Sequence, residues 1–506
     1  LMLRSYANKV VGVRRVAQQN TGASTPGVDL VLAKTPATRG QLVDAMRTDH
    51  KIKAHPVRRI YIPKANGKQR PLGIPTMLDR AAQAVVKNAL EPEWEAQFEP
   101  TSYGFRPGRS AQDAEQKIFQ LCHSGCRKQW VVDADIKGCF DNIDHQKLLD
   151  TLGHFPATRE IRAWLKAGYM EDGVWQPTNT GTPQGGVISP LLANIALHGL
   201  DQALGIRYYR TREGYLQTYS RRAWVRYADD FLVFTKTRED AEQVVAILRE
   251  WLAKRGLSLS EEKTRIVHLK DGFDFLGFNI RQYLTGRTRT GTVTLIKPSK
   301  TAVINVRKKL SDIWATAGSR RLKDTILMLN AVIRGWSNYY RSAVSARIFK
   351  SLDNWMFKKA YSFAVKRHRN KGRRWVVARY FPSRKGIRWA FGDPQSGATL
   401  LRFSQTKIVR HIPVQGYSSP DDARLAAYWD LRRKGRNSML SVKHKKLAHV
   451  QGWSCPVCGQ ALENGEPIRV HYANRGRMFD ARCPDKLLHL FCYQKVQPKS
   501  EAASGS

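Results

Sequence analysis

The sequence predicts an α+β protein of several domains, on three observations. Through residues 51–295, short apolar runs with strand spacing alternate with amphipathic helical stretches. Residues 296–380 lose the strand pattern and become helical and strongly basic. Near the C-terminus a Cys-x-x-Cys pair, Cys455 and Cys458, indicates a small metal-binding module. A chain of 506 residues is long enough for two to four domains.

Composition narrows the class of partner. The chain carries 85 Lys and Arg against 42 Asp and Glu, a net charge of +43, which makes nucleic acid the first candidate and an anionic membrane the second. No run of about 18 apolar residues exists to span a membrane, and residues 1–8 lack the apolar core of a signal peptide. Seven cysteines, an odd number, favour a reducing cytosol over a disulfide scaffold. The absence of Met at position 1 predicts that the chain begins inside a longer reading frame.

The first strand pair that we expect is a hairpin over residues 57–75. Residues 57–63 and 69–75 read as strands, and residues 64–68 contain Asn-Gly and supply the turn. Lys64 and Arg70 then face each other, and two such cations suit a triphosphate. The alternative is a solvated basic hairpin. A helix is expected to start at Asp79.

The next stretch is a loop over residues 102–110 with two arginines, Arg106 and Arg109, and two aromatic residues. Arginine beside aromatic rings suits bases and phosphates, but the same composition fits a packed loop. Ser110 is expected to cap the following helix, with Asp113 three residues on as its capping-box partner.

A strand over residues 129–136 carries two acids. Asp133 and Asp135 share one face because side chains alternate along a strand. Asp144 is expected to cap the helix that follows. Asp135, at the strand end, is either a turn acid or a metal ligand, and the choice depends on a second acidic segment further along the chain.

That second segment is Tyr227-Ala228-Asp229-Asp230, with apolar runs on both sides. The pattern predicts two buried strands joined by a tight turn with two carboxylates at its tip. Adjacent acids between apolar runs repel each other and lose hydration, and divalent cations relieve both penalties. Two metal ions held by carboxylates roughly 3.5–4 Å apart support phosphoryl transfer. The alternative is a solvated turn, and Asp135 as third carboxylate argues against it.

Between these two acidic segments lies a glycine-rich loop, residues 180–190, that opens a helix expected over 191–200. Glycines let backbone approach a base pair closely, and Gln184 can hydrogen-bond in a minor groove. After the acidic turn we expect an amphipathic helix over 241–254 and an aromatic hairpin over 273–278.

Residues 301–380 carry 19 Lys and Arg against three acids, a net charge of +16. One helical face is marked by apolar residues at three- and four-residue steps: Ile326, Leu329, Ile333, Trp336 and Tyr340. This predicts a small helical domain whose basic outer face meets phosphates. Residues 381–450 stay basic with little periodicity. In the last module Cys455 and Cys458, with the later His489 and Cys492, have zinc-ribbon spacing, and a redox pair is the alternative.

Taken together, the chain resembles a bacterial group II intron-encoded reverse transcriptase and maturase over nearly its whole length. The resemblance rests on seven blocks in the family's order, at residues 64–75, 103–110, 133–144, 181–190, 227–234, 258–264 and 275–278. Residues 334–340 resemble the maturase (X domain) signature, and Cys455-x-x-Cys458 resembles the start of the family's HNH endonuclease module. Two departures are an N-terminal segment that looks truncated, and Leu30 where glycine is usual after Gly27-Val28-Asp29.

The resemblance implies a right-hand polymerase and a role for each matching residue. Asp135, Asp229 and Asp230 hold two Mg²⁺, helped by the carbonyl of Ile136. Lys64 and Arg70 hold the triphosphate, Phe140 excludes a ribose 2′-OH, and Gln184 and Gly185 back the nascent pair. Lys263 is a proton donor or a phosphate contact. The structural zinc takes Cys455, Cys458 and Cys492, with His489 or Cys483 as fourth ligand.

The HNH-like module departs from the family pattern. Where a His-His pair is usual, the chain reads His471-Tyr472, and a tyrosine, with its pKa near 10, replaces the histidine expected as base. The histidines usual after Cys492 are also missing, and Asn474 is expected to be a loop residue. We therefore expect the module to fold on zinc without cutting DNA.

The resemblance also implies the division of the chain: an N-terminal extension 1–50, fingers and palm 51–295, thumb or maturase domain 296–380, DNA-binding region 381–450, zinc module 451–495 and a disordered tail 496–506. Expected partners are the intron RNA, target DNA, a DNA primer and dNTPs, in a nucleoid-associated ribonucleoprotein of the bacterial cytoplasm. The expected function is RNA-directed DNA synthesis, splicing and retromobility by target-primed reverse transcription. The alternatives are a splicing-only maturase and a retron-type reverse transcriptase, which the intact acids and the maturase-like segment respectively disfavour.

Overall fold

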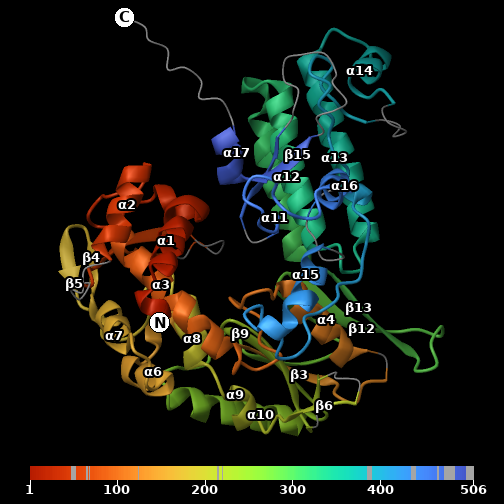
Figure 1. Cartoon of the computed structure of the whole chain (residues 1–506). Coiled ribbons are helices and arrows are strands. Elements are labelled where there is room, and N and C mark those ends of the chain that lie inside the picture. The colour runs from red at the N-terminus through yellow and green to blue at the C-terminus, as the bar shows by residue number, and fades with distance from the viewer. Residues whose placement is uncertain are drawn as a thin grey trace, which may run out of the picture.

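The structure is a computed structural model that describes residues 1–46, 53–63, 67, 69–123, 125–212, 216–218, 220–383, 390–434, 440, 442–463, 466–471 and 485–496. Its elements form an open U in Figure 1. The N-terminal helices stand on one arm, the central sheet forms the base, and the long basic helices stand on the other arm. Among the described residues, no helix is long and apolar enough to cross a membrane.

The first arm is built on helix α3 (Met77–Glu95), which is buried along much of its length. Helix α1 (Tyr6–Arg14) packs on it closely, because a Cβ on Gly12 would lie only 3.0 Å from the side chain of Val85. Helix α2 (Pro36–Ala45) completes this group. The helix expected to start at Asp79 starts earlier, since Thr76 caps it and Asp79 lies in its first turn.

A mixed sheet of order β2-β1-β4-β5 projects from the same arm. Its strands are β1 (Val57–Pro63), β2 (Gln69–Ile74), β4 (Tyr169–Glu171) and β5 (Val174–Gln176). The predicted hairpin is confirmed, with Arg70 paired to Ile62 across it. Lys64 lies outside the described residues, so its predicted position facing Arg70 stays untested.

The base is an antiparallel sheet of order β10-β3-β9-β8. Its strands are β3 (Trp130–Asp135), β8 (Ala223–Tyr227), β9 (Asp230–Thr235) and β10 (Arg265–His268). Alternate residues serve two cores, since Phe231 and Val233 pack with helix α10 (Arg238–Ala253) while Leu232 and Phe234 pack with helix α4 (Ala111–Cys122). The period-two pattern of the sequence therefore places this sheet between two helical layers.

Short helices surround this sheet: α5 (Cys139–Asn142), α6 (His145–Leu152), α7 (Thr158–Lys166), α8 (Ser189–Ala196) and α9 (Leu200–Ala203). The predicted caps are confirmed, because the Asp144 carboxylate accepts from Lys147 N–H and the N–H of Ser110 donates to Asp113. The single helix expected over 191–200 is wrong, because α8 ends at Ala196 and α9 follows Gly199, whose φ is +88°. Two further strands, β6 (Tyr208–Arg210) and β7 (Leu216–Thr218), form a small ribbon.

The second arm stands on a three-stranded sheet of β11 (Phe273–Phe275), β12 (Phe278–Leu284) and β13 (Thr292–Pro298). Its helices are α11 (Lys300–Ala315), α12 (Leu322–Tyr339), α13 (Ala346–Arg367) and α14 (Arg373–Tyr380). Ile326, Leu329 and Ile333 are buried, as their spacing predicts. The hydroxyls of Tyr339 and Tyr340 donate to the carbonyls of Leu276 and Gly277, which fixes α12 on the aromatic hairpin.

The chain after residue 390 returns to the base of the U. Residues 390–434 are mostly loop with helix α15 (Ala426–Lys434), and helix α16 (Val442–Val450) follows. This segment packs on the sheet layer, because Val414 N–H donates to Asp113 and Trp429 fills the space beside Gly108. In the terminal module β14 (Ile468–His471) pairs with β15 (Lys486–His489), and α17 (Leu490–Val496) begins at the next residue. Val496, expected in the tail, ends α17, and residues 497–506 lie outside the described residues.

The two ends of the described chain meet across the opening of the U. The Arg14 guanidinium donates to the Glu466 carboxylate at 2.6 Å and lies 5.7 Å from the centre of the Phe491 ring. The terminal module therefore contacts the first arm.

Candidate active site

Three acids, Asp135, Asp229 and Asp230, meet at one edge of the central sheet, and we call them the acidic triad. Strand β3 ends at Asp135 and strand β9 begins at Asp230, and the antiparallel register places these two residues directly opposite each other. Asp229 lies in the turn between β8 and β9, as the apolar pattern predicts. The structure thus brings together carboxylates that are almost one hundred positions apart in the chain.

The turn before Asp230 is shaped by close backbone packing. Ala228 has a φ of +58°, a left-handed conformation that non-glycine residues adopt at a cost of roughly 1 kcal/mol. The 102–110 loop lies against this turn, since a Cβ on Gly104 would come within 2.3 Å of the Ala228 nitrogen. Tyr103 N–H donates to Arg226 and Arg226 N–H donates to Thr101, so this loop adds a rung beside β8. Backbone contacts therefore fix the orientation of the turn.

The triad is electrostatically under-compensated. Burial, with the charges of Asp229 and Asp135 beside it, raises the pKa of Asp230 to about 7. Burial likewise raises the pKa of Asp229. The Lys263 ammonium donates to Asp135, and this bond raises the pKa of Lys263. Three hard oxygen donors with one exposed lysine beside them match the ligands that divalent cations prefer.

Lys263 reaches the triad from a turn that is fixed to the end of β3. The Ser260 N–H donates to the Asp135 carbonyl, and the Lys137 N–H donates to the Ser258 carbonyl. These two bonds do not use the carbonyl of Ile136, the residue expected to offer a backbone ligand. The structure therefore brings Lys263 to Asp135, and the role of the Ile136 carbonyl as a ligand stays a prediction.

Phe140 lies on α5, which leaves β3 through the left-handed Gly138. Its ring packs edge-on against exposed Phe105, with centroids 6.1 Å apart. It also lines a pocket of about 220 Å³ together with Arg59, Asp141, Tyr169 and Gln184. Strand β1 and the glycine-rich loop thus meet beside the predicted gate residue.

Gln184 and Gly185 link the glycine-rich loop to strand β2. The Gln184 carbonyl accepts from Gly73 N–H at 2.7 Å, and a Cβ on Gly185 would lie 2.5 Å from the Gly73 oxygen. Gly185 also has a φ of +126°. Glycine is required at position 185 for this close approach of two backbones. The Gln184 amide donates to Asp141, a residue to which the sequence analysis gave no role.

Of the two interpretations of the 102–110 loop, the structure supports the packed loop. The guanidinium of Arg106 donates to both oxygens of Glu95, at 2.8 and 2.7 Å, and Arg109 contacts the same carboxylate at 3.4 Å. Both arginines are buried, so they are not available to phosphates in this structure. The signal that sequence reasoning missed is Glu95, an acid at the end of α3 just before the loop.

Four side chains of the terminal module converge as metal ligands do. Cys455, Cys458, His489 and Cys492 each offer one ligand atom, and these atoms lie within 4.8 Å of one another. The Nδ1 atom of His489 faces Cys458. Its Nε2 atom lies 3.0 Å from the Ala461 carbonyl, and this contact fixes the ring. Cys483, the alternative fourth ligand, lies outside the described residues, as do Tyr472 and Asn474. His471 ends β14, with its ring 6.2 Å from that of Tyr493.

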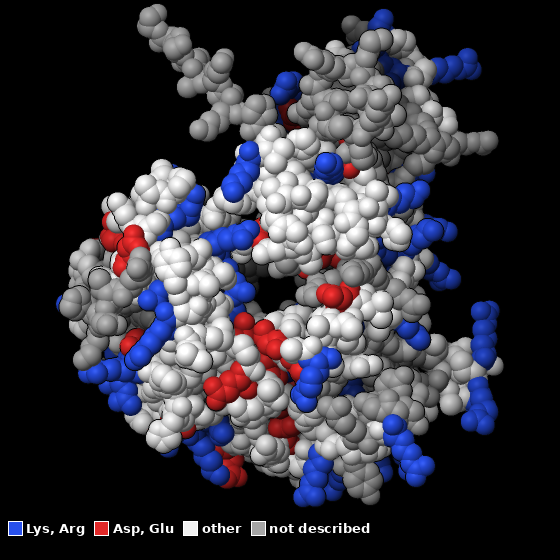
Figure 2. Space-filling model, in the orientation of Figure 1, with Lys and Arg blue, Asp and Glu red and all other residues white. Residues whose placement is uncertain are grey.

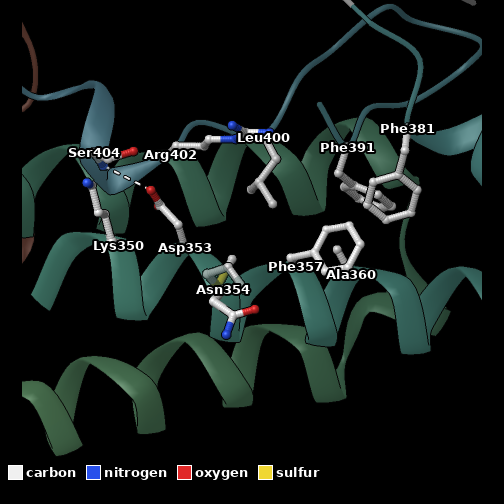
Figure 3. Close-up of a pocket in the computed structure, with 11 residues that line it drawn as sticks. Lys350, Asp353, Asn354, Phe357, Ala360, Phe381, Phe391, Leu400, Arg402 and Ser404 are labelled. Atoms are coloured by element: carbon white, nitrogen blue, oxygen red, sulfur yellow. Dashed lines mark hydrogen bonds between the residues drawn. The ribbon is translucent and has the colours of Figure 1, made fainter. Parts of the chain in front are cut away.

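A separate pocket of about 450 Å³ lies on the second arm, between α13 and residues 391–404. Figure 3 shows Phe357, Phe381 and Phe391 at one end and Lys350, Asp353 and Ser404 at the other. The Asp353 carboxylate accepts the N–H groups of Phe403 and Ser404, so it holds the loop onto the helix. This pocket contains none of the acidic triad.

Charge is unevenly distributed over the surface. Figure 2 shows acidic side chains gathered in the hollow between the arms, near β9 and α8, while Lys and Arg project around the outside. A basic periphery attracts a polyanion, and an acidic centre attracts cations. This pattern suits an enzyme that binds nucleic acid and uses metal ions at the middle of the cleft.

Comparison with known proteins agrees with this geometry. Residues 62–280 match the family model described as reverse transcriptase (RNA-dependent DNA polymerase), residues 303–381 the group II intron maturase-specific domain, and residues 1–46 the N-terminal domain of reverse transcriptase. Group II intron-encoded protein LtrA of Lactococcus lactis subsp. cremoris is 32% identical over 424 residues, which cover 68% of this chain and 70% of that protein. The chain belongs to the group II intron-encoded reverse transcriptases and maturases.

Other relatives of this reverse transcriptase match a smaller share of this chain. Protein YkfC of Escherichia coli (strain K12) is 35% identical over 314 residues, covering 56% of this chain and 82% of that protein. An uncharacterized 91 kDa protein in the cob intron of Schizosaccharomyces pombe is 31% identical, covering 56% of this chain and 43% of its own. A solved telomerase structure from Candida albicans aligns with 64% of each chain at 14% identity and a TM-score of 0.37, too weak a similarity to support a conclusion.

These findings confirm the predicted family and function. The protein has a reverse transcriptase fold of mixed helix and sheet, and it is an RNA-directed DNA polymerase and a splicing maturase. Its maturase domain implies binding of intron RNA, and its reverse transcriptase domain implies use of a divalent cation. The donor set of the triad fits such a cation.

Proposed function

We propose that DNA synthesis takes place at the acidic triad, where Asp135, Asp229 and Asp230 hold two Mg²⁺ with help from the Ile136 carbonyl. The register that pairs Asp135 with Asp230 carries the proposal, because it brings strand-end carboxylates together with Lys263 as their one ion-pair partner among the described residues. Two such ions, when bound, activate an attacking oxygen and stabilise a leaving one. The protein's part is to fix the carboxylates before the ions arrive.

The incoming dNTP is held by residues around the triad. Arg70 on β2 and, by its place in the matching block, Lys64 bind the triphosphate. Phe140 excludes a ribose 2′-OH, and Gln184 and Gly185 place the glycine-rich loop behind the nascent pair. Lys263, which bonds to Asp135 here, donates a proton or contacts a phosphate when the ions hold that carboxylate.

Primer extension on an RNA template tests the assignment. Asp135→Ala or Asp229→Ala is expected to lower cDNA synthesis by at least about a thousandfold, while RNA binding survives because it rests on the basic surface. The matched control is Asp133→Asn, two positions earlier on the same strand face, which is expected to keep synthesis. Substantial extension by either triad variant would show that the metals are held elsewhere.

Intact splicing by the Asp229→Asn variant would separate the maturase role from polymerisation.

The proposed role of Phe140 in excluding a ribose 2′-OH has a separate test. Phe140→Ala opens the pocket wall beside the sugar and is expected to raise the rNTP to dNTP incorporation ratio. Phe105→Leu keeps an apolar contact for the Phe140 ring and serves as control. An unchanged ratio in Phe140→Ala would remove this residue from the gate role.

We divide the chain into N-terminal extension 1–50, fingers and palm 51–295, thumb 296–380, DNA-binding region 381–450 and zinc module 451–495. Within this division we place the maturase surface, which binds the intron RNA, on the basic second arm. Charge reversal of four arginines in or beside α13 and α14 is expected to weaken intron RNA binding and to flatten its salt dependence: Arg367, Arg369, Arg373 and Arg374. Filter binding across a salt series measures both. Unchanged binding would place the RNA on another face.

The same ribonucleoprotein carries the intron into target DNA by target-primed reverse transcription in the bacterial cytoplasm. Its terminal module holds a structural zinc through Cys455, Cys458, His489 and Cys492. Four protein ligands leave no open position for a catalytic water, and His471-Tyr472 lacks the second histidine of the nuclease pattern. The module therefore contacts DNA without cutting the second strand, and the primer is a strand already present at the target. A bottom-strand nick by the purified ribonucleoprotein with Mg²⁺, lost in His471→Ala, would overturn this assignment.

A further inference from the structure

Asp141 directly follows the predicted gate residue Phe140 on α5, and its carboxylate faces the glycine-rich loop. The side-chain amide of Gln184 donates to it in a bifurcated way, with Nε2 at 3.1 Å from one oxygen and 3.2 Å from the other. Both side chains line the pocket of about 220 Å³ that Phe140 also lines. The amide of Gln184 is therefore oriented by a charged partner at the edge of the nucleotide site.

The backbone of the loop is already fixed without this contact. Thr182 N–H donates to the Phe140 carbonyl at 2.6 Å, and Gly181 N–H donates to the Ile143 carbonyl at 2.8 Å. Gly181 lies so close to α5 that an added Cβ would be 2.6 Å from the backbone carbonyl oxygen of Asp141. On its other side, the Gln184 carbonyl accepts from Gly73 N–H. What the Asp141 side chain adds is the direction of one terminal amide.

The hydrogen-bonding chemistry of the two side chains decides which end of the Gln184 amide faces Asp141. A glutamine amide has an NH₂ end that only donates and an oxygen end that only accepts, and its torsion is soft. An ionised carboxylate only accepts, so it binds the NH₂ end and turns the Oε1 atom away from itself. An amide held in this way keeps its Oε1 atom as an acceptor, the group that a hydroxyl or amino donor requires. A hydrogen bond to a charged group is about twice as strong as a neutral one, which suits a residue that must hold one orientation.

We propose that Asp141 is a positioning residue of the polymerase, which holds the Gln184 amide in the orientation that binds the incoming dNTP. The proposal rests on the assignment of Gln184 to the nucleotide site. It gives Asp141 no contact with the reacting atoms, so removing its carboxylate weakens dNTP binding and spares the chemical step.

The test is a double-mutant cycle on the full chain, with steady-state dNTP kinetics on an RNA template. Asp141→Ala and Gln184→Ala are each expected to raise KM for dNTP by about tenfold, with kcat changed less than about threefold. The double variant is expected to match Gln184→Ala alone, because without the amide there is nothing left to orient. Asp141→Asn, which keeps one acceptor oxygen, is expected to recover most of the affinity and also reports if the alanine variant does not fold.

The matched control is Asp144→Ala in the same segment, whose carboxylate caps α6 by accepting from Lys147 N–H at 2.8 Å. It is expected to lower Tm and to leave KM unchanged, which separates loss of stability from loss of positioning. If Gln184→Ala raises KM but Asp141→Ala does not, or if the double variant shows the product of the two single effects, the role of Asp141 is overturned alone. If Gln184→Ala leaves KM unchanged, the assignment of Gln184 fails and the role of Asp141 fails with it.

Discussion

Two groups of carboxylates lie close together at the base of this reverse transcriptase, one partly exposed and one buried, and they are built in opposite ways. The first is the acidic triad of Asp135, Asp229 and Asp230. The second, which we call the arginine–carboxylate cluster, consists of Glu95, Glu99, Arg106, Arg109 and Arg226. Arg226 connects them, because it lies on β8 just before the acidic turn and binds Glu99 at 3.0 Å.

The difference appears in the protonation of each group. Burial opposes ionisation of Glu99, yet Arg226, His198 and the N–H of Gly199 hold its pKa at about 2. Asp230 has acids where Glu99 has an arginine, and its pKa is raised to about 7. The cluster pairs each carboxylate with arginine, whereas among the described residues the three acids of the triad share one ion-pair partner, the exposed Lys263. A buried acid with protein cations around it is structural, and one without them is a candidate metal ligand.

The largest effect is expected from breaking the cluster. Glu95→Gln leaves Arg106 and Arg109 buried without their carboxylate, and we expect a loss of about 3–5 kcal/mol in the free energy of unfolding. Urea denaturation measures it. The control is Glu242→Gln, which removes an exposed i,i+4 pair with Arg238 and is expected to change stability by less than about 0.5 kcal/mol. Equal effects of the two variants would show that the cluster is not structural.

A third kind of buried acid sharpens the comparison. Burial raises the pKa of Glu115 on α4 to about 7, against the lowering influence of Ser342, His411 and Arg410. The folded chain then binds a proton that the unfolded chain releases near pH 4.5, so the stability contributed by this group falls as pH rises from about 4.5 to 7. Glu115→Gln removes that fall, and we expect a gain of about 1–3 kcal/mol at pH 8 with little change at pH 4. Thermal unfolding at both pH values measures the difference, and a gain that is equal at both would contradict it.

The triad is expected to respond to substitution in the opposite sense to the cluster. In EDTA, Asp230→Asn removes a repelling charge and is expected to raise the free energy of unfolding by at most about 1 kcal/mol, because solvent screens the exposed side chain. Mg²⁺ is expected to raise the Tm of the wild type, because an ion that binds only the folded state stabilises it, and to raise that of the variant much less. A variant that is less stable than the wild type in EDTA would place Asp230 among the structural acids.

The smallest effect is expected from the backbone. Leu30 shares a left-handed conformation with Ala228, with φ of 55° and 58°, but Leu30 is 68% exposed and far from the acidic turn in the chain. Leu30→Gly is expected to stabilise the protein by about 0.5–1 kcal/mol, because glycine adopts this conformation without strain. Leu30→Ala keeps the Cβ and is expected to give no gain. A gain from alanine would assign the effect to the exposed leucine side chain instead.

Sequence patterns predicted what depends on near neighbours. Alternating apolar residues around Asp229-Asp230 specified two strands and a turn, because a strand repeats every two residues and a local run is enough to show it. The apolar steps from Ile326 to Ile333 specified the buried face of α12 for the same reason. The caps at Ser110 and Asp144 also followed from residues three positions apart. Leu30 has a φ of 55°, a conformation that glycine adopts without strain, and this local property explains why the resemblance leads one to expect glycine there.

Only the tertiary structure decided which charged groups meet. Arg106 and Arg109 have the composition of a phosphate-binding loop, and the nearness of Glu95 on α3 makes them structural instead. The pairing of Asp135 with Asp230, the contact of Lys263 with Asp135 and the bond from Gln184 to Asp141 each join positions that local periodicity does not relate. An acid or a base is compensated, oriented or left open by partners tens of residues away. The sequence by itself therefore determined the elements and the family of this reverse transcriptase, and the long-range packing of the chain decided which of its charges serve stability and which are left for metal and nucleotide.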